Sequence, residues 1–228
     1  MEAKSALILG ASTGLGKSLA KQLAQKGFNL ILAARNSEEL NRNATDLAIR
    51  YNVKCHVVQI DLSITQDGYI ADRFSDCLKN QLKVEYLFLI SGLNSDFDDE
   101  NIPDSEMDIL INTNFVGPSK ILKHFVQYVK TLPENSQFFV VTASTIAVAR
   151  MRGRNLVYAS SKIALEAFVE GIRHATANLP ITLQTYRLGY VDTLKSYGQK
   201  LLFPSLDPHK AATKIISNLS KPQKTNFY

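Results

Sequence analysis

The chain has 228 residues, of which 45% are hydrophobic and 21% are charged, and its formal net charge is +5 at pH 7. This length and apolar content suit one large α/β domain. No stretch approaches the ~20 apolar residues of a membrane span, and the first apolar stretch is too short for a signal peptide, so we expect a cytoplasmic protein without a transmembrane segment.

The charged residues and the cysteines exclude several other classes of protein. Acidic side chains gather between residues 96 and 108, and lysines are frequent from residue 195 onwards. We interpret both regions as solvated surfaces. No basic stripe with interleaved aromatic residues is visible, so we expect no nucleic-acid partner. Cys55 and Cys77 have no metal-ligand spacing and predict neither a metal site nor a disulfide framework.

Short apolar, β-branched runs alternate with helical patterns along the chain. The expected strands are Ala6–Leu9, Leu30–Ala34, Cys55–Ile60, Tyr86–Ile90, Phe138–Thr142 and Ile181–Tyr186, with a seventh starting near the end of the sequence. The expected helices are Leu15–Lys26, Glu38–Tyr51, Asp67–Gln81, Asp104–Thr131, Val157–Asn178 and Pro208–Leu219. Strands that are apolar on both faces, in strand–helix–strand order, predict a Rossmann-type doubly wound parallel sheet of six to seven strands, in a single domain over residues 1–228. Its ligand should bind beyond the carboxyl ends of the strands.

A glycine-rich turn follows the first expected strand and opens the first helix. Glycine permits a positive φ and lets the backbone approach a pyrophosphate, and the helix N-terminus offers free N–H groups and the positive end of a dipole. A turn that binds nothing is the alternative. The segment predicts a nucleotide site formed by Gly10, Ser12, Thr13, Gly14, Leu15 and Gly16.

The ends of the next two strands indicate which nucleotide is bound. Arg35 follows the second strand, where an acidic residue would accept hydrogen bonds from a ribose 2′-hydroxyl. The planar guanidinium of an arginine suits a 2′-phosphate instead. We therefore expect NADP(H) to be preferred and leave NAD(H) open, the alternative being a surface arginine at the head of a helix. Asp61 and Leu62 end the third strand, where they can meet an adenine edge.

Tyr158 and Lys162 are four residues apart in a helical pattern and therefore share one face of the helix. An ammonium beside a phenol favours the phenolate, so the pair predicts a lowered pKa for Tyr158. A tyrosine of this kind can act as a general acid or base. Because the spacing is common, two unrelated helical residues are the alternative.

These residues together resemble the short-chain dehydrogenase/reductase family over the range from Gly10 to Thr193. The match comprises the turn glycines, a helix Asn followed three residues later by Gly, the Tyr–Lys pair, and a motif after the sixth strand that ends in a cofactor-contacting Thr. In this sequence these features are Gly10, Gly14, Gly16, Asn114, Gly117, Tyr158, Lys162, Gly189, Val191 and Thr193. The resemblance implies hydride transfer between a nicotinamide cofactor and a carbonyl or alcohol carbon, with Tyr158 exchanging a proton with the substrate oxygen and Lys162 also holding the cofactor ribose.

The resemblance also implies a catalytic hydroxyl and a proton relay. A separation of thirteen residues from the tyrosine selects Thr145, whereas the family's usual residue type selects Ser144; we favour Thr145. The backbone carbonyl of Asn114 is expected to hold a relay water. Because Pro118 has no N–H to give to that carbonyl, it would help to keep it free, the alternative being a packing kink.

The sequence departs from the family after the fourth strand, where Leu89-Ile90-Ser91-Gly92 replaces Asn-Asn-Ala-Gly. We still expect Ser91 and Gly92 to line the cofactor. The loop before Tyr158 contains Arg150, Arg152 and Arg154, which suit an anionic substrate, although a solvated or interface loop is the alternative. The stretch from Thr142 to Thr193 also resembles, partially, the keto-sugar reductase partner of the decaprenylphosphoryl-ribose 2′-epimerase system.

We therefore expect an NADP-preferring short-chain oxidoreductase with a small carbonyl or alcohol substrate, and the arginine loop favours a phosphorylated or glycosyl ketone. The alternatives are a 3-oxoacyl-thioester reductase and a non-catalytic nucleotide sensor with the same fold. The family implies a homodimer or homotetramer formed through helices. Apolar positions that could serve this purpose, at least half of which we expect to be core, are Leu165, Phe168, Val169 and Ile172.

Overall fold

Seven parallel strands form one sheet in the computed structural model, in the order β3-β2-β1-β4-β5-β6-β7. The structure describes residues 3–79, 81–133, 136–149, 151, 153–189, 191, 205–221 and 225–227. The strands are β1 Ser5–Leu9, β2 Asn29–Ala34, β3 Cys55–Gln59, β4 Val84–Leu89, β5 Phe138–Thr145, β6 Ile181–Leu188 and β7 Thr225–Phe227. The predicted doubly wound sheet is confirmed. Its winding reverses between β1 and β4, which is where a ligand crevice forms in such sheets.

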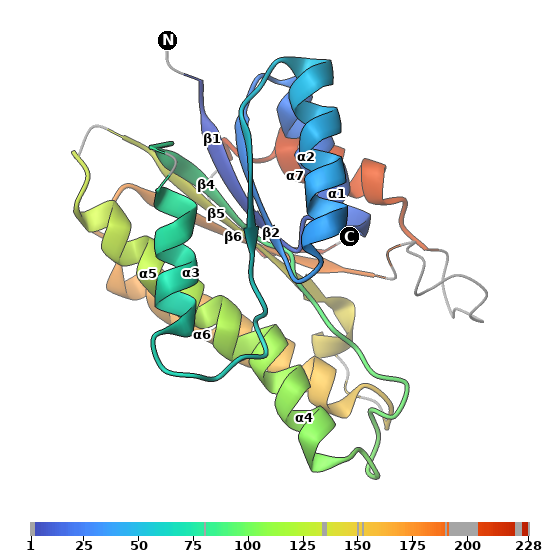
Figure 1. Ribbon diagram of the computed structural model, residues 1–228. Coiled ribbons are helices and arrows are strands. Elements are labelled where there is room, and N and C mark those ends of the chain that lie inside the picture. Colours follow the sequence, from blue (N-terminus) through green and yellow to red (C-terminus); the bar gives the residue numbers. More distant parts are fainter. Residues whose placement is uncertain are drawn as a thin grey trace.

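Helices cover both faces of the sheet (Figure 1). One face carries α1 Gly14–Gln25, α2 Ser37–Tyr51 and α7 Pro208–Ser217. The other face carries α3 Tyr69–Leu78, α5 Gly117–Lys130 and α6 Leu156–Ala175. Side chains alternate between the faces along each strand: in β1, Ile8 enters the first core and Leu7 the second. Both faces of the strands are apolar because both are buried.

The helix predicted over Asp104–Thr131 is interrupted. The structure has α4 over Asp104–Ile111, a π-helical segment over Asn112–Val116, and then α5. Pro118 cannot donate to the carbonyl of Asn114, so the ordinary i→i−4 ladder is broken at this point. The backbone widens instead, and the N–H of Gly117 donates to the carbonyl of Asn112, five residues back. Single π-helical turns of this kind are frequent at functional sites.

The candidate interface positions on α6 divide between core and partial burial. Leu165 and Val169 are fully buried core residues. Phe168 and Ile172 are partly buried against the same core. The expectation that at least half of these positions belong to the core is confirmed. Within the part of the chain that the structure describes, no helix has the length and apolar content to cross a membrane.

Candidate active site

The ends of β4 and β5, the π-helical segment and the start of α6 meet at the carboxyl edge of the sheet. The position of Gly92 shows how closely they approach: a Cβ added there would lie 3.5 Å from Lys162 Nζ and 3.9 Å from Asn114 Oδ1. Lys162 is only 2% exposed, and its Nζ donates to the carbonyls of Ser91 at 3.0 Å and Ala143 at 3.3 Å. The structure therefore brings together four separate segments of the sequence.

The Tyr158–Lys162 pair lies in one helix turn, as predicted, with Lys162 Nζ 6.0 Å from the centre of the Tyr158 ring. Burial lowers the pKa of Lys162 to about 8, against the opposing effect of the Glu166 carboxylate. Burial also raises the pKa of Tyr158 to about 12. The prediction of a lowered tyrosine pKa is therefore wrong for this structure. The lost hydration of the phenolate outweighs the attraction of an ammonium whose protons are directed at two carbonyls.

Asn114 fixes the loop that follows β4. Its side chain is fully buried; Nδ2 donates to the Leu93 carbonyl at 2.7 Å, and Oδ1 accepts from the Leu93 N–H at 2.8 Å. This two-way bond ties the loop to the π-helical segment. Because Pro118 lacks an N–H, no ordinary helical bond can take up the Asn114 carbonyl. The water relay at that carbonyl stays a prediction.

The two candidate hydroxyls at the end of β5 lie in different surroundings. Ser144 is 5% exposed, and among the described residues its Oγ has no hydrogen-bond partner. By strand alternation it shares the face of Val140, which α6 covers. Thr145 is partly exposed, and its Oγ1 accepts from the N–H of Ala147 at 3.2 Å, which leaves its own proton free to donate. Neither hydroxyl bonds to that of Tyr158 in the described part of the chain.

The glycine-rich turn has the shape of an anion cradle. Gly10 has a φ of +88°, and a Cβ added to Gly16 would lie 2.1 Å from the Gly10 carbonyl oxygen, so the backbone closes on itself. Thr13, the N-cap residue before α1, makes no side-chain capping bond, and the first turn of α1 contains no acidic residue. The backbone of Ser12 is hydrogen-bonded to α2, because Asn43 Nδ2 donates to the Ser12 carbonyl at 3.1 Å. The residues present therefore fit a nucleotide pyrophosphate.

The residues predicted to meet the adenosine also lie along this edge. Arg35 is exposed after β2, and within the described ranges its guanidinium has no hydrogen-bond or ion-pair partner. Asp61 Oδ1 accepts from the N–H and hydroxyl of Ser63 at 2.9 and 2.6 Å. Leu62 packs against Gly117, where an added Cβ would lie 2.8 Å from the Leu62 Cβ. This contact joins the turn after β3 to the helix that carries Asn114.

Several predicted residues come after β6 or in the arginine loop. Gly189 directly follows β6, and Val191 forms an isolated parallel bridge with Leu206. Arg154 is exposed. The remaining predictions in these segments, at Arg150, Arg152 and Thr193, lie outside the described residues.

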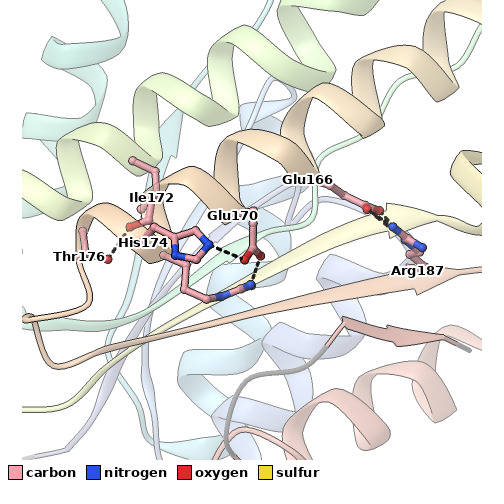
Figure 2. A network of polar contacts seen from close by, with 7 residues as sticks. Glu166, Glu170, Ile172, His174, Thr176 and Arg187 are labelled. Atoms are coloured by element: carbon pink, nitrogen blue, oxygen red, sulfur yellow. Dashed lines mark hydrogen bonds and ion pairs between the residues drawn. The ribbon is translucent and has the colours of Figure 1, made fainter.

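Two acidic residues that the sequence patterns did not indicate interact with the site. Asp98, assigned to a solvated acidic surface, is 3% exposed and accepts backbone N–H groups at the start of α6. Glu166 pairs with Arg187 of β6, with Oε2 2.6 Å from Nη2 (Figure 2). A sequence signal for Glu166 was present, since it lies one helical turn after Lys162. Asp98 has no local signal, because its partners are about sixty residues away.

The comparisons with known proteins agree with this arrangement. The sequence model of the short chain dehydrogenase family matches residues 4–198, and the chain belongs to that family. An uncharacterized oxidoreductase of Staphylococcus epidermidis is 24% identical, over 98% of this chain and 94% of that protein. The very-long-chain 3-oxoacyl-CoA reductase of Anas platyrhynchos is 25% identical, over 97% of this chain and 70% of its own.

Among solved structures, the fold is similar to that of an alcohol dehydrogenase from Thermococcus sibiricus complexed with 5-hydroxy-NADP. The TM-score is 0.85 and the identity 24%, over all of this chain and 95% of that one. Family, fold and relatives together define the chain as an NAD(P)-dependent oxidoreductase.

Proposed function

We propose that the protein reduces a ketone to a secondary alcohol with NADP(H), and that Tyr158 supplies the proton. The observation that carries this proposal is the placement of Lys162, buried beneath the carboxyl ends of β4 and β5 and one helical turn from Tyr158. A nicotinamide held at this edge of the sheet would supply a hydride to the carbonyl carbon. The chain's own residues then have to manage the negative charge that develops on the carbonyl oxygen.

Proton transfer from Tyr158 balances that charge. Burial raises the pKa of Tyr158 to about 12, so the hydroxyl is protonated at neutral pH and suited to donate. As the Tyr158 oxygen releases its proton to the substrate, the Lys162 ammonium stabilises the phenolate that remains. The Thr145 hydroxyl donates a hydrogen bond to the same substrate oxygen, and the relay through Asn114 returns a proton to the site.

Arg35 supports a preference for NADP(H). Its guanidinium is exposed beside the adenosine end of the cradle, without an ion-pair partner among the described residues. A 2′-phosphate would supply that partner. The test is the dissociation constant of each reduced cofactor in Arg35→Ala: NADPH binding should weaken about tenfold and NADH binding should not change. Equal loss for both cofactors would contradict the assignment.

Two observations bear on the substrate class. The arginine loop favours an anionic ketone such as a phosphorylated or glycosyl keto-sugar, whereas the 3-oxoacyl-CoA reductase relative favours an oxoacyl thioester. We also propose, from the family, a homo-oligomer in the cytoplasm. The free thiols of Cys55 and Cys77 are consistent with that compartment.

The deciding experiment follows the absorbance of reduced cofactor. NADPH and NADH are each tested with cyclohexanone, acetoacetyl-coenzyme A and fructose 6-phosphate, with Tyr158→Phe as the control. We expect NADPH-dependent reduction of at least one ketone that is lost in the control. Tight NADPH binding without turnover on any ketone would instead support a non-catalytic nucleotide sensor.

A further inference from the structure

Helix α6 begins without a cap of its own. Asn155 precedes its first turn with a φ of 64°, in the left-handed region, and makes no side-chain capping bond. The N–H groups of the first helical residues have no partner inside a helix. Tyr158 is the third residue of α6. The position of this first turn therefore fixes the Tyr158 backbone, from which the side chain extends.

Asp98 closes this helix end from the loop between β4 and α4. Its carboxylate accepts the N–H of Val157 at 2.7 Å and that of Tyr158 at 2.9 Å. Its backbone carbonyl accepts the N–H of Asn155 at 2.7 Å and that of Leu156 at 3.4 Å. One residue therefore satisfies four consecutive backbone donors, the last of which belongs to Tyr158.

Asp98 differs from the acidic residues around it. It is 3% exposed, whereas Asp96 and Glu100 are exposed. A buried carboxylate requires compensation, and here two N–H groups and the positive end of the α6 dipole supply it. The same loop begins at Gly92 and Leu93, beside Lys162 and Asn114. It therefore connects both sides of the candidate active site.

We infer that Asp98 is a positioning residue for the proton donor: it fixes the first turn of α6 and thereby holds the Tyr158 hydroxyl in line with the substrate oxygen. The inference rests on the proposed role of Tyr158. Asp98 acts through the Tyr158 backbone and through the two residues before it. A displacement of a catalytic group by about 1 Å can lower a rate about 100-fold, so a loosened first turn has a measurable effect.

The test is Asp98→Asn, which keeps the size of the side chain but replaces one acceptor oxygen with an amide that opposes a backbone N–H. With the best ketone of the panel, kcat should fall about 10- to 100-fold, while the dissociation constant of NADPH stays within roughly twofold. Asp96→Asn, from the same acidic run but exposed, should behave as the wild type. Amide hydrogen exchange at Val157 and Tyr158 should accelerate in Asp98→Asn alone.

A double variant separates positioning from general structural support. If Asp98 acts through Tyr158, adding Asp98→Asn to Tyr158→Phe should cause no further loss of the residual rate. An equal further loss, an unchanged kcat in Asp98→Asn, or a parallel weakening of NADPH binding would overturn the inference. Full activity of Tyr158→Phe alone would instead overturn the proposed function.

If Asp98→Asn does not fold, Asp98→Glu carries the same test. The longer side chain keeps the carboxylate but moves it by one methylene group. An intermediate loss of kcat with unchanged NADPH affinity supports the positioning role, and an unchanged kcat overturns it.

Discussion

The N-termini of α1 and α6 lie at the same edge of the sheet and are treated in opposite ways. Thr13 leaves the first turn of α1 without a side-chain cap, and no acidic residue lies in that turn. At α6, Asp98 accepts the N–H groups of Asn155, Leu156, Val157 and Tyr158. The first helix end is open to an anion from outside, and the second is already closed by an anion of the protein.

The difference between the two helix ends suggests separate roles in cofactor binding and in catalysis. A helix end whose N–H groups are free is a site for a phosphate, because a ligand can complete it. A helix end whose N–H groups are satisfied is rigid, and it suits a side chain that must be held in one place. On this interpretation α1 contributes affinity for the cofactor, and α6 contributes the rate of proton transfer.

The largest expected effect tests this division directly. Tyr158→Phe removes only the hydroxyl at the closed end, so kcat should fall about 1,000-fold, within the usual range for loss of a general acid. The dissociation constant of NADPH, measured from its fluorescence, should change by less than roughly threefold. A loss of affinity as large as the loss of rate would show that binding and chemistry are not separated.

The next largest effect is on stability and comes from the buried ammonium of Lys162 in α6. The pKa of Lys162 is lowered from 10.5 to about 8 by burial, so the folded protein binds fewer protons than the unfolded chain between these values. Stability should therefore rise with pH above about 8, by up to about 3 kcal/mol in total from this group. Above pH 10 the raised pKa of Tyr158 acts in the opposite direction, because only the unfolded phenol then ionises.

Lys162→Met isolates this contribution. The difference in unfolding free energy between wild type and variant, from urea titrations at pH 7, 8, 9 and 10, cancels the groups that both proteins share, including the half-buried thiol of Cys55 and the buried thiol of Cys77. As the pH rises, the free energy of unfolding of the wild type should increase relative to that of the variant. Parallel pH profiles would mean that another group carries the lowered pKa.

The sequence patterns predicted the sheet and the tight backbone of the glycine-rich turn, but they predicted the surroundings of Tyr158 incompletely. The turn from Gly10 to Gly16 and the Tyr158–Lys162 pair are short-range patterns, so their geometry follows from local rules. The π-helical segment was missed, because a helical pattern shows that Pro118 breaks the ladder but not how the backbone widens. The Asp98 cap was missed because the chain must fold before its partners meet it, and the tyrosine pKa was wrong because burial is a tertiary property.

Adding a side-chain cap to the uncapped N-terminus of α1 should make it resemble the capped N-terminus of α6. Thr13 already has the extended backbone of an N-cap, so Thr13→Asp should cap α1 and stabilise the protein by about 0.5 kcal/mol. The new carboxylate would occupy the N–H groups and repel phosphate, and NADPH binding should weaken about tenfold. Thr13→Ser, which adds no charge, is the matched control. Thermal unfolding and NADPH titration measure both effects, and unchanged NADPH affinity would argue against phosphate binding at α1.

The smallest effect compares an ion pair made by α1 with an ion pair made by α6. Lys17 and Glu39 form an exposed pair beside α1, with 53% and 29% of their side chains exposed, whereas Arg187 and Glu166 beside α6 are 26% and 14% exposed.

The Glu166 carboxylate raises the pKa of Lys162. Glu166→Gln should therefore lower the pKa of Lys162 further, while an amide oxygen still accepts from Arg187. In the proposed mechanism protonated Lys162 stabilises the phenolate, so the alkaline fall of kcat should begin about half a pH unit lower, a roughly threefold loss of rate at alkaline pH. Glu39→Gln should leave the profile in place, since water screens its charge. A shift of the same size in both variants would mean that net charge, rather than burial beside Lys162, controls the pH dependence.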